Sequence, residues 1–206
     1  MMNKPGMLVV YSGPSGVGKG TILGPFLNDH PNAVLSVSVT TRQPRPGEID
    51  GVHYSFITKD EFQHLIDTDG LLEYAQYSGN YYGTPKAAVD KMRAQGKDVF
   101  LEIEVQGAMK IKKSCPEAVL VFILPPTYES LKERLLCRGT ETKEIMEARL
   151  NTAKFELAQA KEYDYIIIND DVGRARKQLC AVVEAAKCET RYMLEYIEKL
   201  VNLTEK

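Results

Sequence analysis

The stretch MLVVYSGPSGVGKGT, residues 7–21, decides the fold of this 206-residue chain. Residues 7–11 are an apolar run that predicts a buried strand, and residues 21–28 predict a helix. Between them, Gly13 to Lys19 match the spacing G-x-x-x-x-G-K. In a strand–loop–helix context this spacing is typical of a loop that holds the phosphates of a nucleoside triphosphate. The alternative is a glycine-rich turn that binds nothing, and the strand and helix on either side argue against it.

The chemistry of phosphate binding explains the residue types in this loop. Glycines let successive backbone N–H groups turn inward around a phosphate, and the N-terminus of the following helix adds favourable partial charge. We expect Lys19 to reach the β- and γ-phosphates. Gly20 stands where the strict motif has Ser or Thr, so water or Thr21 would have to supply that ligand to a magnesium ion. The predicted triphosphate-binding residues of the loop are Gly13, Pro14, Ser15, Gly16, Val17, Gly18, Lys19, Gly20 and Thr21.

Beyond the loop, apolar runs alternate with amphipathic stretches. The later predicted strands of the core are residues 99–105, 118–124 and 165–169. Strands this apolar, alternating with helices, predict an α/β protein whose parallel β-sheet is flanked by helices on both faces. Residues 36–90 and 127–160 fit this pattern poorly because they are polar and rich in Arg, Tyr and Glu. We expect both segments to be insertions at the ligand-binding edge of the sheet.

A second phosphate site is predicted in the stretch SVTTRQPRPGEIDGVHY, residues 38–54. Pro44 and Pro46 restrict the backbone and so reduce the entropy lost when the loop becomes ordered. Arg42 and Arg45 could then present planar guanidinium groups to one phosphate. Two arginines in a loop are more often only a solvated surface, but the phosphate-binding loop elsewhere in the chain favours a binding role.

Six stretches occur in the order SGPSGVGKGT, SVTTRQPRPGEIDGVHY, LLEYAQYSGNYYGTP, LEIEVQGA, RLLCRGTE and IINDD. Together they resemble the guanylate kinase family of nucleoside monophosphate kinases, over nearly the whole chain from about Gly6. The resemblance implies transfer of the γ-phosphoryl group of ATP to GMP, and to dGMP, giving ADP and GDP in purine nucleotide metabolism. It implies a P-loop core of residues 1–35, 91–126 and 161–206, a GMP-binding insertion of residues 36–90 and a helical lid of residues 127–160. We expect the last core segment to end in one long helix, from residue 172 to about 201.

The resemblance also implies roles for individual residues. Lys19 and the lid arginines would be catalytic, and Asn169, with Asp170 beside it, would lie near the adenine of ATP. The implied lid arginines are Arg134, Arg138 and Arg149. The implied GMP-binding residues are Ser38, Arg42, Arg45, Tyr54, Glu73, Tyr82, Gly83, Thr84 and Glu104.

The hydrogen-bonding groups of guanine fit these acids and hydroxyls. Guanine presents N1–H and N2–H as adjacent donors, which a carboxylate such as Glu73 can accept, and O6 as an acceptor for the Thr84 hydroxyl. Adenine has an acceptor at N1, so a buried carboxylate would face a lone pair. Glu102 and Glu104 alternate with apolar residues, so on one strand their side chains would share a face. We expect Glu102 to orient Mg²⁺ through water.

The acceptor oxygen of GMP is already an anion, so phosphoryl transfer needs charge neutralisation rather than a general base. His30, His53 and His64 form no catalytic set in the sequence and are interpreted as bystanders. Two alternatives stay open. One is another monophosphate kinase, such as an adenylate kinase, and the other is a guanylate kinase-like scaffold that binds phosphorylated peptides without catalysis.

The composition of the chain limits the kinds of partner that it is expected to bind. The net charge is −2, so no overall basic field favours nucleic acid. No window is long and apolar enough for a membrane span, and the N-terminus lacks a signal-peptide pattern. The four cysteines form no C-x-x-C pair, which favours thiols in a reducing compartment. We therefore expect a cytoplasmic enzyme that binds ATP, GMP and Mg²⁺, without an obligate protein partner.

Overall fold

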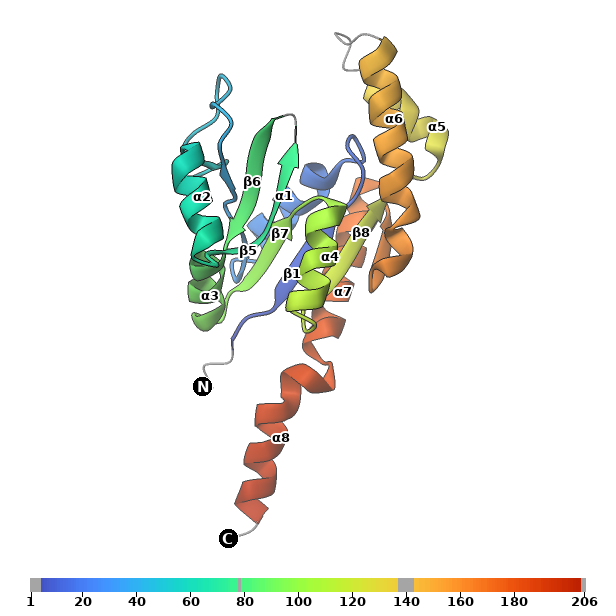
Figure 1. Ribbon diagram of the computed structural model, residues 1–206. Helices are drawn as coiled ribbons and strands as arrows, with labels where there is room; N and C mark the ends of the chain where they lie inside the picture. The colour runs from blue at the N-terminus through green and yellow to red at the C-terminus, as the bar shows by residue number, and fades with distance from the viewer. Residues whose placement is uncertain (1–4, 78, 137–142, 205–206) are drawn as a thin grey trace.

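The computed structural model describes residues 5–77, 79–136 and 143–204 (Figure 1). Its core is a five-stranded sheet in which every neighbouring pair of strands is parallel. The strand order is β2 (Ala33–Leu35), β7 (Asp98–Glu102), β1 (Leu8–Ser12), β8 (Val119–Leu124) and β9 (Tyr165–Ile168). The α/β class predicted from the apolar runs is confirmed.

Helices cover both faces of this sheet because its central strands are apolar on both sides. Val9 and Tyr11 of β1 belong to a buried cluster with helices of one face, whereas Leu8 and Val10 belong to a cluster on the other. The first face carries α1 (Lys19–Asp29) and α7 (Val172–Lys187), and the second carries α3 (Lys86–Ala94) and α4 (Val105–Ser114). This double burial fixes the carboxyl ends of β1 and β7 side by side, where ligands bind in open parallel sheets.

The prediction of one strand over residues 99–105 is wrong at its end. Strand β7 stops at Glu102, in register with Tyr11, and Glu104 is the N-cap of helix α4, which the sequence analysis missed. The alternation of acids and apolar residues imitated a strand, but β1 offers no further pairing beyond Ser12, where its chain turns into the loop. Glu102 and Glu104 are therefore not neighbours on one strand face.

The prediction of one long terminal helix is also wrong. Helix α7 ends at Lys187, and a separate helix α8 (Thr190–Thr204) extends away from the body (Figure 1). Tertiary contacts redirect the chain, since Tyr192 Oη donates to the carbonyl of Glu117 at 2.5 Å and Arg191 donates to that of Pro116 at 3.2 Å.

A small four-stranded sheet lies within residues 39–85. Its strand order is β4 (Ser55–Phe56), β3 (Val39–Thr40), β6 (Asn80–Pro85) and β5 (Leu71–Tyr77). Helix α2 (Lys59–Asp67) begins at a capping box, in which Thr58 and Glu61 bond each other's backbone N–H. Phe62 of this helix packs with Val39 and Leu71 of the sheet in a separate buried cluster.

On the opposite side of the core stand α5 (Tyr128–Leu136) and α6 (Lys143–Ala158), followed by the short helix η1 (Ala160–Glu162). Figure 1 shows α5 and α6 rising on one side of the parallel sheet and the small sheet with α2 rising on the other. The carboxyl ends of β1 and β7 lie between them. Among the described residues, no helix is both long enough and apolar enough to cross a membrane.

Candidate functional site

The loop after β1 has the backbone that a phosphate-binding loop requires. Gly16 and Gly18 have φ values of +79° and +91°, a region that L side chains rarely adopt. Close packing adds a second constraint, because a Cβ on Gly18 would lie 2.6 Å from Nδ2 of Asn169. Gly18 also forms the N-cap of α1, so the loop leads directly into a helix N-terminus.

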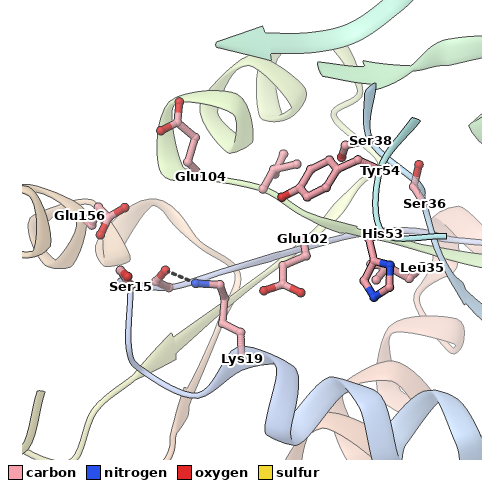
Figure 2. A pocket seen from close by; sticks show the side chains of 12 residues that line it. Ser15, Lys19, Leu35, Ser36, Ser38, His53, Tyr54, Glu102, Glu104 and Glu156 are labelled. Atoms are coloured by element: carbon pink, nitrogen blue, oxygen red, sulfur yellow. Dashed lines mark hydrogen bonds between the residues drawn. The ribbon is translucent and has the colours of Figure 1, made fainter. Parts of the chain in front are cut away.

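Lys19 lies in the first turn of α1 and folds back over the loop. Its Nζ donates to the carbonyl oxygen of Gly13 at 2.7 Å (Figure 2). Burial lowers the pKa of Lys19, while the charges of Glu102 and Glu156 act in the opposite direction. The ammonium is therefore held by its own loop, where it is positioned to bind a phosphate.

Asn169 and Arg134 hold the loop from the other side. Asn169 is buried, and its Nδ2 donates to the carbonyl of Val17 at 2.7 Å. Arg134 on α5 donates to the carbonyls of Val17 and Asn169 at 3.2 and 3.3 Å. Both side chains thus contact the segment of the loop that precedes α1. Asn169, which was predicted to lie near the adenine, is therefore hydrogen-bonded to Arg134, which was predicted to be a lid arginine.

A cavity of about 360 Å³ opens between the loop and the small-sheet side of the protein. Lys19 and Ser15 line it from the loop, and Ser38 and Tyr54 line it from the insertion. In Figure 2 the Tyr54 hydroxyl points into this space. Residues from the two predicted anion sites therefore share one cavity, as direct transfer between two bound substrates requires.

The predicted arginine pair of the second site is organised by an acid that the sequence analysis missed. Glu48 accepts two hydrogen bonds from the Arg42 guanidinium, at 2.8 and 2.9 Å, and one from the backbone N–H of Arg45 at 2.7 Å. The hydrogen bond from Arg42 lowers the pKa of Glu48 to about 2. One edge of the Arg42 fork is thus already occupied, and the loop between the two arginines is closed into a fixed turn. Arg45 is exposed.

Aromatic rings fix the Arg42 side chain from another direction. Its guanidinium carbon lies 5.5 Å from the centre of the Tyr54 ring and 5.7 Å from that of Phe56. Tyr82 packs edge-on against Tyr54 with ring centres 6.0 Å apart. The two predicted hydroxyl donors and the predicted arginine therefore form one cluster.

The predicted base-recognition pair is also in contact. Glu73 on β5 is 5% exposed, and the buried Thr84 hydroxyl donates to its Oε1 at 2.6 Å across the β5–β6 pair. Burial raises the pKa of Glu73, an effect that the Thr84 hydrogen bond and the charge of Lys110 partly offset. Glu104, at the start of α4, also has its pKa raised by burial, and it lines the cavity.

Gly107 of helix α4 faces Glu73 so closely that it belongs to the same site. A Cβ on Gly107 would lie 2.4 Å from Oε2 of Glu73. Glycine inside a helix costs about 1 kcal/mol relative to alanine, so its presence is a signal of close approach. The signal was missed because the sequence analysis did not predict helix α4.

We predict that Gly107→Ala displaces the Glu73 carboxylate while leaving the fold intact. The atom that the new Cβ would meet is Oε2 of Glu73, which lies at the end of a flexible side chain and not in the backbone. The KM for GMP, the acceptor predicted from the sequence, should rise by at least about tenfold, since small misplacements in a site are costly. The KM for ATP should stay within about twofold. Steady-state kinetics with each substrate varied in turn, and Gly24→Ala as a control glycine with open space around it, would measure this. An unchanged KM for GMP would contradict the contact.

The donor set near Lys19 fits a hard cation taken up together with phosphates. Glu102 supplies carboxylate oxygens to the cavity, and its charge acts on Lys19. The Thr21 hydroxyl donates to the carbonyl of Gly18 at 2.6 Å, which leaves its lone pairs available as acceptors. Among the described residues, no three His, Cys, Asp or Glu side chains are grouped to hold a metal by themselves. This chemistry suits a cation held largely by substrate oxygens and water.

The remaining predicted residues lie elsewhere. Arg149 sits on α6 and does not line the described cavity, and Arg138 lies outside the described residues. Gly83 is buried in β6, directly opposite Tyr74 of β5. Asp170 pairs with Arg174 on the surface.

The parallel core, the loop at its edge and the second cluster across one cavity define the class of P-loop nucleotide kinases. The family model described as guanylate kinase matches residues 5–186. A protein named guanylate kinase from Clostridioides difficile (strain 630) is 48% identical over 200 residues, which cover 97% of this chain and 98% of that relative. Another of that name, from Desulfitobacterium hafniense (strain Y51), is 47% identical over 191 residues, covering 93% and 96%.

A solved structure agrees with these sequence matches. The crystal structure of guanylate kinase from Anaplasma phagocytophilum superposes with a TM-score of 0.74 and 33% identity, covering 91% of this chain and 89% of that one. The chain belongs to the guanylate kinase family.

Proposed function

We propose that this member of the family transfers the γ-phosphoryl group of ATP to GMP, and also to dGMP, giving ADP and GDP. Residues 13–21 and Asn169 bind ATP, and the insertion of residues 36–90 together with Glu104 binds the acceptor. The observation that supports this arrangement is the shared cavity, to which Lys19 contributes from one side and Ser38 and Tyr54 from the other.

Two groups of residues bind GMP, one at its phosphate and one at its guanine base. The cluster of Arg42, Tyr54 and Tyr82, with Arg45 beside it, binds the phosphate through charge-assisted hydrogen bonds. Glu73 accepts the N1–H and N2–H of guanine, and Thr84 faces O6. The single hydroxyl hydrogen of Thr84 is donated to Oε1 of Glu73, which fixes the carboxylate that selects the base, so donation to O6 would require this hydrogen to turn away from Glu73.

Catalysis by this chain consists of positioning and charge neutralisation. The Lys19 ammonium gives up its hydrogen bond to the carbonyl of Gly13 and bonds phosphate oxygens instead. There it stabilises the negative charge that develops on the transferring phosphoryl group. The lid of residues 127–160 brings Arg134, Arg138 and Arg149 toward the phosphates and excludes water. Mg²⁺, when bound with ATP, neutralises phosphate charge, and Glu102, with Thr21 as a further candidate, orients its water ligands. A cytoplasmic location stays a prediction.

An acceptor assay tests this function. ADP formation should be measured by a coupled assay, with ATP as donor and GMP, dGMP or AMP as acceptor at matched concentrations. We expect kcat/KM for GMP to exceed that for AMP by at least about 10³-fold, because AMP leaves the Glu73 carboxylate without donors. Equal use of AMP and GMP would contradict the base assignment, and ADP formation without any acceptor would contradict a transferase.

A further inference from the structure

Ser12 ends strand β1, immediately before Gly13 and the phosphate-binding loop, and the roles inferred from the sequence do not include it. Its side chain is fully buried. Its Oγ donates a hydrogen bond to the carbonyl oxygen of Ile103 at 2.8 Å. In the sequence, Ile103 lies between Glu102 and Glu104, and all three residues line the cavity. A buried, directed contact therefore joins the start of the phosphate-binding loop to a segment that carries two acids of the site.

The hydroxyl of Ser12 extends the link between β1 and β7 by one residue. The two strands are in register as far as the pair of Tyr11 and Glu102. One residue further, the side chain of Ser12 bonds the carbonyl of Ile103. Because a peptide group is planar, a bond that fixes this carbonyl also fixes the direction of the next N–H and the position of the next Cα, which belong to Glu104.

The first turn of α4 has no other directed contact of this kind at its cap. Glu104 is the N-cap residue, and in the described structure its side chain makes no capping hydrogen bond. Its carboxylate instead lines the cavity. Val105 and Ala108 anchor the helix in a buried apolar cluster, but hydrophobic packing is non-directional and does not set the rotation of one peptide group. The Ser12 hydrogen bond supplies that direction.

Helix α4 carries the same orientation to the second acid of the base site. Gly107 lies in the first turn of α4, and a Cβ on it would lie 2.4 Å from Oε2 of Glu73. On the other side, Lys19 donates to the carbonyl of the residue that follows Ser12, at 2.7 Å. Figure 2 shows Lys19 and Glu104 reaching the cavity from different elements. Ser12 thus lies between the lysine proposed to bind ATP and the acids proposed to bind guanine.

We propose that Ser12 is a positioning residue that sets the guanine-binding acids relative to the phosphate-binding loop. It acts through the carbonyl of Ile103 and touches neither substrate, because its side chain is fully buried. The proposal rests on the proposed function, which assigns Glu104 and Glu73 to guanine. Its consequence is that loss of the hydroxyl weakens binding of GMP and relaxes selection of the base. A hydrogen bond that serves stability alone would lower the melting temperature and leave both KM values unchanged.

The test is Ser12→Ala, studied by steady-state kinetics with each substrate varied in turn and by thermal unfolding. We expect the KM for GMP to rise by about five- to thirtyfold, the range that corresponds to loss of one buried hydrogen bond, and the preference for GMP over AMP to fall. The KM for ATP should stay within about twofold, because Asn169 and Arg134 hold the loop independently at Val17.

Two further variants control for the substitution itself. Ser114→Ala removes a hydrogen bond from a hydroxyl to a backbone carbonyl at the other end of α4, where Ser114 donates to Lys110 at 3.1 Å, and should leave all constants unchanged. Ser12→Cys keeps a side chain of similar shape with a weaker donor, so its KM for GMP should lie between those of wild type and Ser12→Ala. If Ser12→Ala does not fold, Ser12→Cys takes its place in the test.

A double-mutant cycle with Glu104→Ala tests the route of the effect. If Ser12 acts through Glu104, adding Ser12→Ala to Glu104→Ala should raise the KM for GMP by a clearly smaller factor than it does in wild type. Additive factors would overturn the proposal, and so would a folded Ser12→Ala protein whose KM for GMP is unchanged or rises only as much as that for ATP. An unchanged KM for GMP in Glu104→Ala alone would instead overturn the assignment of Glu104 to guanine. Failure of wild type to use GMP would overturn the proposed function itself.

Discussion

Replacing Lys19 with alanine is expected to lower kcat by at least about 100-fold, with the protein still folded. The magnitude is typical of removing one charged group that stabilises a developing charge in a low-dielectric site. The ammonium contacts its own loop through Gly13 and Pro14, at 2.7 and 3.4 Å, so its removal leaves the buried strand and the helix in place. Lys19 is half-buried, and burial lowers its pKa.

Steady-state kinetics at saturating ATP and GMP would measure the effect of Lys19→Ala. Lys177→Ala, which removes one exposed positive charge from α7, is the matched control and should keep full activity. Thermal unfolding of both variants would show whether the fold persists. A Lys19→Ala protein with wild-type kcat would contradict the catalytic assignment.

Replacing Glu73 with glutamine is expected to lower kcat/KM for GMP by about 10- to 100-fold and to reduce the preference for GMP over AMP by a larger factor. The carboxylate offers two acceptor oxygens to the adjacent N–H groups of guanine. Glutamine replaces one of these with an NH₂ donor, which faces guanine donors unfavourably but suits N1 of adenine. Thr84 can still donate to the remaining oxygen.

The same substitution should change the pH dependence of stability. Because the folded-state pKa of Glu73 is raised, its contribution to the free energy of unfolding is fully present below the ordinary glutamate value of 4.5 and is lost as pH rises through the raised value. Glutamine does not titrate, so this loss disappears in the variant. The free energy of unfolding of Glu73→Gln, relative to wild type, should therefore increase with pH above about 4.5.

Urea denaturation at several pH values, together with the acceptor assay, would check both expectations. Glu184→Gln, an exposed carboxylate on α7 that pairs with Lys187 at 3.1 Å, should change neither selectivity nor this pH profile. A Glu73→Gln protein that still prefers GMP as strongly as wild type would contradict the role of Glu73 in base selection.

Most of the fold was predictable because it depends on patterns of apolar and polar residues within short segments of the sequence. The apolar runs of β1, β8 and β9 led to the correct elements. The two errors have one physical cause. Residues 103–105 alternate like a strand, and residues 187–190 contain no glycine or proline, yet the available pairing partner and the contacts of Tyr192 decided where each element ended.

Residue types and spacing were sufficient to predict the candidate site in part. Lys19, Tyr54 and Ser38 were predicted from motifs, and the structure places them around one cavity. The contact of Gly107 could not be predicted, because it involves Glu73, a residue far away in the chain.

By itself, the sequence determined the parallel core and the position of the phosphate-binding loop, since these depend on local periodicity and on side-chain chemistry, and its resemblance to the guanylate kinase family implied the hydrogen-bonding groups that suit guanine. Only the tertiary structure decided which side chains of the site come into contact with one another. Packing of α4 places Gly107 against Glu73, and the turn that follows Arg45 brings Glu48 onto Arg42. Electrostatic and steric contacts depend on distance in space, and the order of residues along the chain does not state that distance.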